Sequence, residues 1–134
     1  MDNRIIRLWD EYKGLLEQHI KQTNQEEIEY EFLVKLIVKE IINRGEIEYD
    51  ADKITVIDNG DYQGTQIFII PRDIYQPEAE WYLVTYAEYG SCSGCDTIIG
   101  IKGYEGGLPD EEQVKDYMTL CLHLIQRMKP LYEI

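Results

Sequence analysis

The stretch KITVIDNGDYQGTQIFIIP, residues 53–71, decides the fold class because two runs rich in β-branched and aromatic residues flank a turn-forming segment. The runs predict two strands, and DNGDYQG (residues 58–64) between them predicts a hairpin loop. A third strand is predicted by EWYLVTYAEY (residues 80–89). Because the connections leave no room for crossover helices, we expect an antiparallel meander. EIEYD (residues 46–50) could add a short edge strand, so the sequence predicts three or four strands.

Two helices are predicted before the strands. Residues 1–22 carry apolar side chains at helical spacing, namely Ile5, Leu8, Trp9, Tyr12, Leu16 and Ile20. A second helix is predicted over residues 26–44, because Thr23 and Glu26 have the spacing of a capping box and Gly45 is a typical helix stop. Its apolar residues cover more than one stripe, so this helix is expected to lie at the centre of the core.

Two further helices are predicted after the strands. A short one should span about residues 94–101, with Ser91 or Ser93 as its cap. A longer one should begin at Pro109 and run to residue 128 or 129, where Pro130 stops it. The sequence therefore predicts an α+β fold in one domain, residues 1–134, with the C-terminal helix packed beside the second helix on one sheet face.

The charge balance restricts the partners. The chain has 26 acidic and 13 basic residues, a net charge of −13, which repels phosphate backbones and argues against direct nucleic-acid binding. Between residues 73 and 101 there are acidic residues and no basic one. The composition favours an interaction with a protein that has a basic surface, and the alternative interpretation is that the acidity serves solubility alone. It leaves the oligomeric state open.

The sequence contains no phosphate-binding glycine loop, no GxSxG elbow and no HExxH motif. We therefore predict no catalytic residue and no cofactor, which argues against an enzyme. No stretch approaches the roughly 18 apolar residues of a membrane span. The first residues are charged where a signal peptide would be apolar, so we expect a cytoplasmic protein.

YGSCSGCDTII, residues 89–99, is the one stretch that points to chemistry. The candidate functional surface consists of Tyr89, Ser91, Cys92, Ser93, Cys95 and Asp96. Cys92 and Cys95 have the CxxC spacing, which suits a soft metal or a redox pair. The small polar residues and glycines equally suit a tight corner, with Asp96 accepting backbone hydrogen bonds. We favour the corner and keep the metal and thiol interpretations as alternatives.

Neither alternative has full support from the rest of the chain. Structural zinc needs four ligands, and the remaining candidates, Cys121, His123 and His19, form no second ligand pair. The CxxC motif follows the last strong strand, whereas a thioredoxin-like site follows the first strand of a βαβ unit. Three cysteines, an odd number, are expected to stay reduced, with Cys121 buried and inert.

One resemblance extends across the C-terminal part of the chain. YGSCSGCDTIIGI (residues 89–101) and PDEEQVKDYMTLCLHLIQRMKPLY (residues 109–132) resemble a group of small uncharacterised phage and prophage proteins of Gram-positive bacteria. The resemblance covers residues 81–132 and implies an accessory protein in the cytoplasm of a bacterial host, without implying any catalytic residue. An alternative is a DNA mimic, whose carboxylates replace phosphates and inhibit a host nucleic-acid-binding protein.

Overall fold

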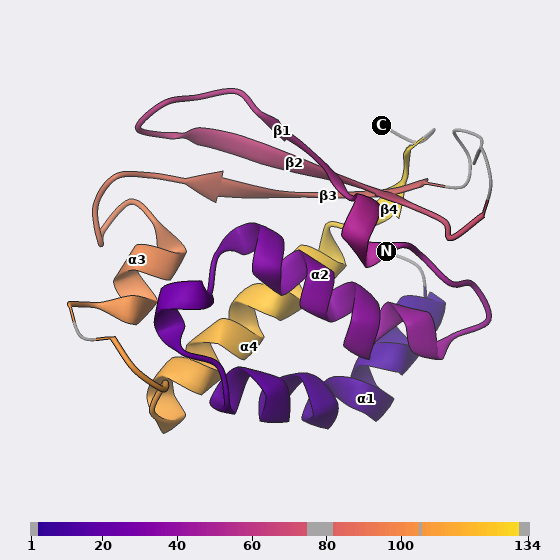
Figure 1. The fold of residues 1–134 in the computed structure, drawn as a ribbon, viewed down its shortest axis with the longest axis horizontal. Helices are drawn as coiled ribbons and strands as arrows, with labels where there is room; N and C mark the ends of the chain where they lie inside the picture. The colour runs from indigo at the N-terminus through magenta and orange to yellow at the C-terminus, as the bar shows by residue number, and fades with distance from the viewer. Residues whose placement is uncertain (1–2, 75–81, 105, 132–134) are drawn as a thin grey trace.

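The structure, a computed structural model, describes residues 3–74, 82–104 and 106–131. Its main elements are, in chain order, α1 (Asn3–Lys21), α2 (Tyr30–Glu40), β1 (Thr55–Asp58), β2 (Gly64–Pro71), β3 (Tyr82–Tyr89), α3 (Thr97–Lys102), α4 (Glu111–Gln126) and β4 (Lys129–Pro130). Figure 1 shows this order along the ribbon. The α+β fold and the predicted order of helices and strands are confirmed.

The sheet is an antiparallel meander with the strand order β1-β2-β3-β4. The predicted hairpin joins β1 to β2, and its register places Ile57 opposite Ile67. On the other side of β2, Ile67 lies opposite Tyr86 of β3. The β1–β2 and β2–β3 pairs are therefore antiparallel neighbours without a crossover helix, as the sequence indicates, whereas β3 reaches β4 through α3 and α4. Residues 80 and 81 of the predicted third strand lie outside the described residues.

The predicted position of the fourth strand is wrong. Residues 46–50 make only one isolated bridge, between Tyr49 and Arg72, beside the end of β2. The fourth strand is instead β4, which pairs with β3 at the opposite edge, with Pro130 across from Leu83. Proline has no N–H group, so it is tolerated there because an edge position leaves one side of the strand unpaired.

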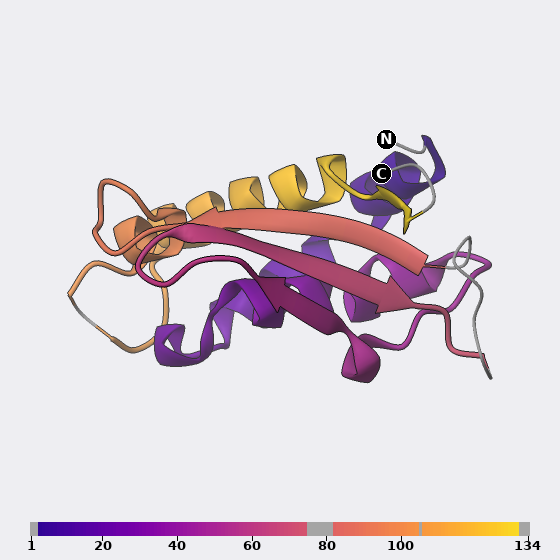
Figure 2. The same cartoon turned by 90° about the horizontal axis from the view of Figure 1, so that it is seen from above.

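The elements form three layers. Helices α2 and α4 lie together against one face of the sheet, and α1 packs on the far side of both (Figure 1). A buried hydrogen bond fixes α4 to the sheet, because the Thr85 hydroxyl donates to the carbonyl oxygen of Leu124 at 2.7 Å. Seen from above, the strands lie in front of the helices, so all four helices lie on the same side of the sheet (Figure 2).

Helix α2 is the centre of the core, as predicted. Six of its residues are buried: Tyr30, Leu33, Val34, Leu36, Ile37 and Val38. Its predicted bounds of 26–44 are too wide, because single 3-10 turns precede and follow it. Thr23 does not form the expected capping box, since its hydroxyl donates to the carbonyl oxygen of His19 and closes α1. Asn24 accepts the Glu26 N–H instead and caps the first 3-10 turn.

The bounds of the last two helices also differ from those predicted. Helix α3 begins at Thr97, and its cap is Asp96 rather than Ser91 or Ser93. Helix α4 has Asp110 as its cap, with a reciprocal capping box to Gln113, so Pro109 precedes the helix. Its last residue is Gln126, two residues before the earliest predicted end, because the chain turns there to join the sheet as β4.

Candidate functional site

The segment between β3 and α3 forms a closed turn. The carbonyl oxygen of Cys92 accepts hydrogen bonds from the backbone N–H groups of Cys95 at 3.0 Å and Asp96 at 2.9 Å. Gly90 packs directly against this turn, because a Cβ atom there would lie 2.5 Å from the carbonyl oxygen of Cys95 and 2.7 Å from its sulfur. A tight corner is therefore present, and glycine is required at position 90. Gly94 has open space around it, so the corner does not depend on that glycine.

Asp96 holds this turn to the core. Its carboxylate accepts the Gly90 N–H at 2.9 Å, the Ile99 N–H at 3.1 Å and the Tyr30 hydroxyl at 2.9 Å. The side chain is buried, so these three donors replace water around the charge. Burial and the hydrogen bond to Asp96 raise the pKa of Tyr30 to about 12, which keeps this phenol a donor. The predicted role of Asp96 as a backbone acceptor is confirmed.

Cys92 and Cys95 are free and exposed at the surface of this turn. The Cys95 sulfur accepts the backbone N–H of Cys92 at 2.8 Å, and its thiol donates to the Cys92 carbonyl oxygen at 3.2 Å. The pKa of the Cys95 thiol is lowered, mainly by a hydrogen bond with the Cys92 side chain and further by backbone N–H groups of Cys92 and Ser91. Such donors favour the thiolate, which is the reactive form of cysteine.

The third cysteine has the opposite environment. Cys121 is fully buried in α4, and burial raises the pKa of its thiol, so it stays protonated as the sequence indicated. His123 lies on the exposed side of the same helix. Within the described ranges, no group of three His, Cys, Asp or Glu side chains could hold a metal ion. The cysteine pair therefore provides two ligands, where structural zinc takes four.

The remaining candidate residues do not gather around the cysteines. The Tyr89 hydroxyl donates to the carboxylate of Asp58 at the hairpin end of the sheet. This hydrogen bond raises the pKa of Tyr89 to about 12 and lowers the pKa of Asp58. Ser91 and Ser93 are exposed on the turn. The predicted six-residue surface thus separates into the exposed turn, the buried Asp96 and a Tyr89–Asp58 pair.

A second candidate site, which the sequence analysis missed, is the sheet face turned away from the helices. We call it the outer face and define it by Ile57, Ile67, Ile69, Val84 and Tyr86. Side chains alternate along a strand, and the other apolar positions of β2 are buried against the helices. Among the described residues, the core cluster between sheet and helices includes none of these five. Ile57 is 47% exposed and Tyr86 is 40% exposed, whereas Ile67 and Ile69 are half-buried and Val84 is buried. The accessible part of this apolar face is therefore centred on Ile57 and Tyr86.

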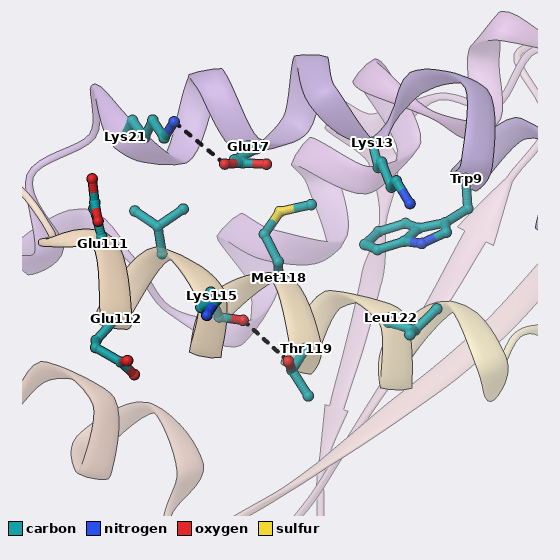
Figure 3. A pocket seen from close by; sticks show the side chains of 11 residues that line it. Trp9, Lys13, Glu17, Lys21, Glu111, Glu112, Lys115, Met118, Thr119 and Leu122 are labelled. Atoms are coloured by element: carbon teal, nitrogen blue, oxygen red, sulfur yellow. Dashed lines mark hydrogen bonds and ion pairs between the residues drawn. The ribbon is translucent and has the colours of Figure 1, made fainter.

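A groove of about 610 Å³ lies between α1 and α4 (Figure 3). Trp9 and Leu122 lie at one end of it, with Met118 in the middle. Its charged lining consists of Lys13, Lys21 and Lys115 together with Glu17, Glu111 and Glu112. Because three basic residues balance three acidic ones, the groove favours neither anions nor cations. It therefore indicates no ligand class.

Comparisons with protein-family models, with curated proteins and with solved structures find no match for the chain. Among the described helices, none combines the length and the apolar character that crossing a membrane requires. The function must therefore be argued from the turn and the outer face themselves.

Proposed function

We propose that this protein is a small acidic accessory protein of a phage or prophage, which acts by binding a host protein through the outer face of its sheet. The observation that carries the proposal is that this face is apolar although no described helix covers it (Figure 2). Contiguous apolar surface of this kind is typical of binding sites rather than of free protein surface. The resemblance of residues 81–132 to phage and prophage proteins supports a role inside a bacterial host.

The arrangement of the outer face suits a flat apolar contact. Ile57, Ile67 and Tyr86 lie directly opposite one another across three strands, and Ile69 lies opposite Val84 in the next row. Tyrosine and isoleucine side chains of this kind make up the buried centre of protein interfaces. Four of these side chains, Ile57, Ile67, Ile69 and Tyr86, therefore provide the accessible apolar centre, and charged groups around them provide the rim.

The charges favour a partner with a basic surface. Glu88 follows Tyr86 on the same face of β3, and Asp61 is exposed in the hairpin loop at that end of the sheet. The Arg127 guanidinium lies over the Tyr86 ring, 4.8 Å from its centre, and donates to the Tyr86 carbonyl oxygen. With a net charge of −13, long-range attraction selects a basic protein and disfavours a second copy of this chain.

The test compares two matched double variants. Ile57→Thr/Tyr86→Thr removes two exposed apolar side chains from the outer face while keeping residues that suit strands. Leu15→Gln/Tyr104→Thr removes the same kinds of side chain from exposed positions elsewhere. Partners are captured from a host lysate and purified, and their affinity is measured by calorimetry. Loss of about 1 kcal/mol per removed side chain predicts a Kd roughly 30-fold higher for the outer-face variant alone.

Three results would overturn the proposal. Equal affinity of the wild-type protein and the outer-face variant would show that the partner binds elsewhere. An unchanged Kd at high salt would contradict a basic partner, because surface charges are screened by salt. Concentration-dependent dimerisation that the outer-face variant abolishes, seen by sedimentation, would make a second copy the occupant of this face.

A further inference from the structure

The CxxC turn has chemistry that the binding function does not use. Its two thiols are exposed, and the Cys95 sulfur accepts the backbone N–H of Cys92 at 2.8 Å. Asp96 fixes the turn at both ends, because it accepts the N–H of Gly90 before the cysteines and the N–H of Ile99 after them. The cysteines therefore lie on a fixed support, which reduces the movement needed to join their sulfur atoms.

We propose that Cys92 and Cys95 form a thiol–disulfide exchange site, at which the dithiol reduces a disulfide substrate and closes to an intrachain disulfide. Cys95 is the attacking residue, because its sulfur accepts the backbone N–H of Cys92 at 2.8 Å and this donor stabilises a thiolate. Cys92 is the resolving residue, because it belongs to the same turn and is exposed. The substrate class is an accessible disulfide, either of low molecular weight or on a protein surface.

The reaction takes place in two steps. The Cys95 thiolate attacks one sulfur of the substrate, the substrate S–S bond breaks, and the first thiolate leaves and takes up a proton. The Cys92 thiol then loses its proton and attacks the Cys95 sulfur in the mixed disulfide, so that the second substrate thiolate leaves and is protonated. The two cysteines lose two electrons in total, and the substrate disulfide becomes two thiols.

Gly90 makes room for the Cys95 side chain at the end of β3. A Cβ atom at position 90 would lie 2.7 Å from the Cys95 sulfur, so the glycine there leaves room for this side chain beside the strand end. The carboxylate of Asp96 is directed to Gly90, Tyr30 and Ile99, and it accepts hydrogen bonds from all three. The pKa of the Cys95 thiol is lowered, because the thiol interacts with the Cys92 side chain and with backbone N–H groups.

The test uses oxidised glutathione as the substrate and mass spectrometry as the readout. The wild-type protein should lose two hydrogen masses and keep no glutathione, whereas Cys92→Ser should accumulate a mixed disulfide at Cys95. Cys121→Ser is the matched control, because that thiol is fully buried, and it should behave like the wild type. In variants that keep one exposed thiol, Cys95 should be alkylated at least about tenfold faster than Cys92, since the thiolate is the nucleophile.

Each contrary result would overturn the proposal. Stable glutathione adducts on the wild-type protein, without closure, would show that the two sulfurs cannot be joined. Equal alkylation rates would remove the distinction between attacking and resolving cysteine. Stoichiometric zinc or copper in the purified protein, whose removal is needed before the thiols react, would show that the pair is a metal site. Circular dichroism of every variant confirms that the comparison is made between folded proteins.

Discussion

Replacing Asp96 by alanine is expected to destabilise the protein by about 3–7 kcal/mol. The substitution leaves the Gly90 N–H and the Tyr30 hydroxyl without their acceptor, at about 1–3 kcal/mol for each buried donor. Loss of the cap on α3, where Ile99 donates, adds about 1 kcal/mol. Urea unfolding measures the change as a lower midpoint at an unchanged slope.

Two further variants separate the contributions to this loss. Asp96→Asn keeps one acceptor oxygen and should cost less than Asp96→Ala. Combining Tyr30→Phe with Asp96→Asn in a double-mutant cycle should give a coupling energy above about 0.5 kcal/mol, because the two side chains are hydrogen-bonded. Asp116→Ala is the control, since Asp116 is exposed on α4 and should change stability by no more than about 0.5 kcal/mol. A loss below about 1 kcal/mol for Asp96→Ala would refute the reasoning.

Three other measurements test local features. Burial and a hydrogen bond raise the pKa of Tyr30 to about 12, so its contribution to stability is constant below pH 10.0 and is lost as the pH rises through 12. Urea unfolding measured against pH should show this loss of stability. The Tyr30→Phe variant should lose less stability over the same pH range. Tyr89→Phe should raise the pKa of Asp58 in an NMR titration, with little change in stability because that pair is exposed. Gly90→Ala should destabilise the protein by about 1–3 kcal/mol in thermal unfolding, since the added methyl group would lie 2.5 Å from a carbonyl oxygen. Gly94→Ala is the control, because position 94 has open space around it and the stability should change by no more than about 0.5 kcal/mol.

Elements with a strong local pattern were predictable from the sequence. The β-branched runs around the 58–64 loop predict β1 and β2, because the signal lies in consecutive residues and in the turn between them. The apolar spacing of residues 114–125 likewise predicts α4. Element ends were less predictable, because they depend on which partner a polar side chain selects. Thr23 could have capped the next helix, but its hydroxyl bonds to the helix before it.

The fourth strand could not be predicted from local pattern. Lys129 and Pro130 have no strand-like sequence, and they pair with β3 only because α4 ends beside the open edge of that strand. Tertiary position therefore determines this element. The cap of α3 is a similar case. Serine and aspartate are both good caps, and Asp96 takes the role because it also accepts the hydroxyl of Tyr30 from α2, 66 residues away.

The outer face could have been predicted from the run of apolar residues in β2, which the strand prediction did not use. Residues 67–70 of β2 are four consecutive apolar residues, whereas a strand covered on one face alternates apolar and polar side chains. Such a run predicts that both faces of the strand are apolar. The helices cannot cover both faces, because α2 and α4 pack on the same one (Figure 2). Ile67 and Ile69 then remain on the open side, next to the exposed Ile57 and Tyr86. Because no described helix covers this face, it is the surface on which we place the proposed basic partner.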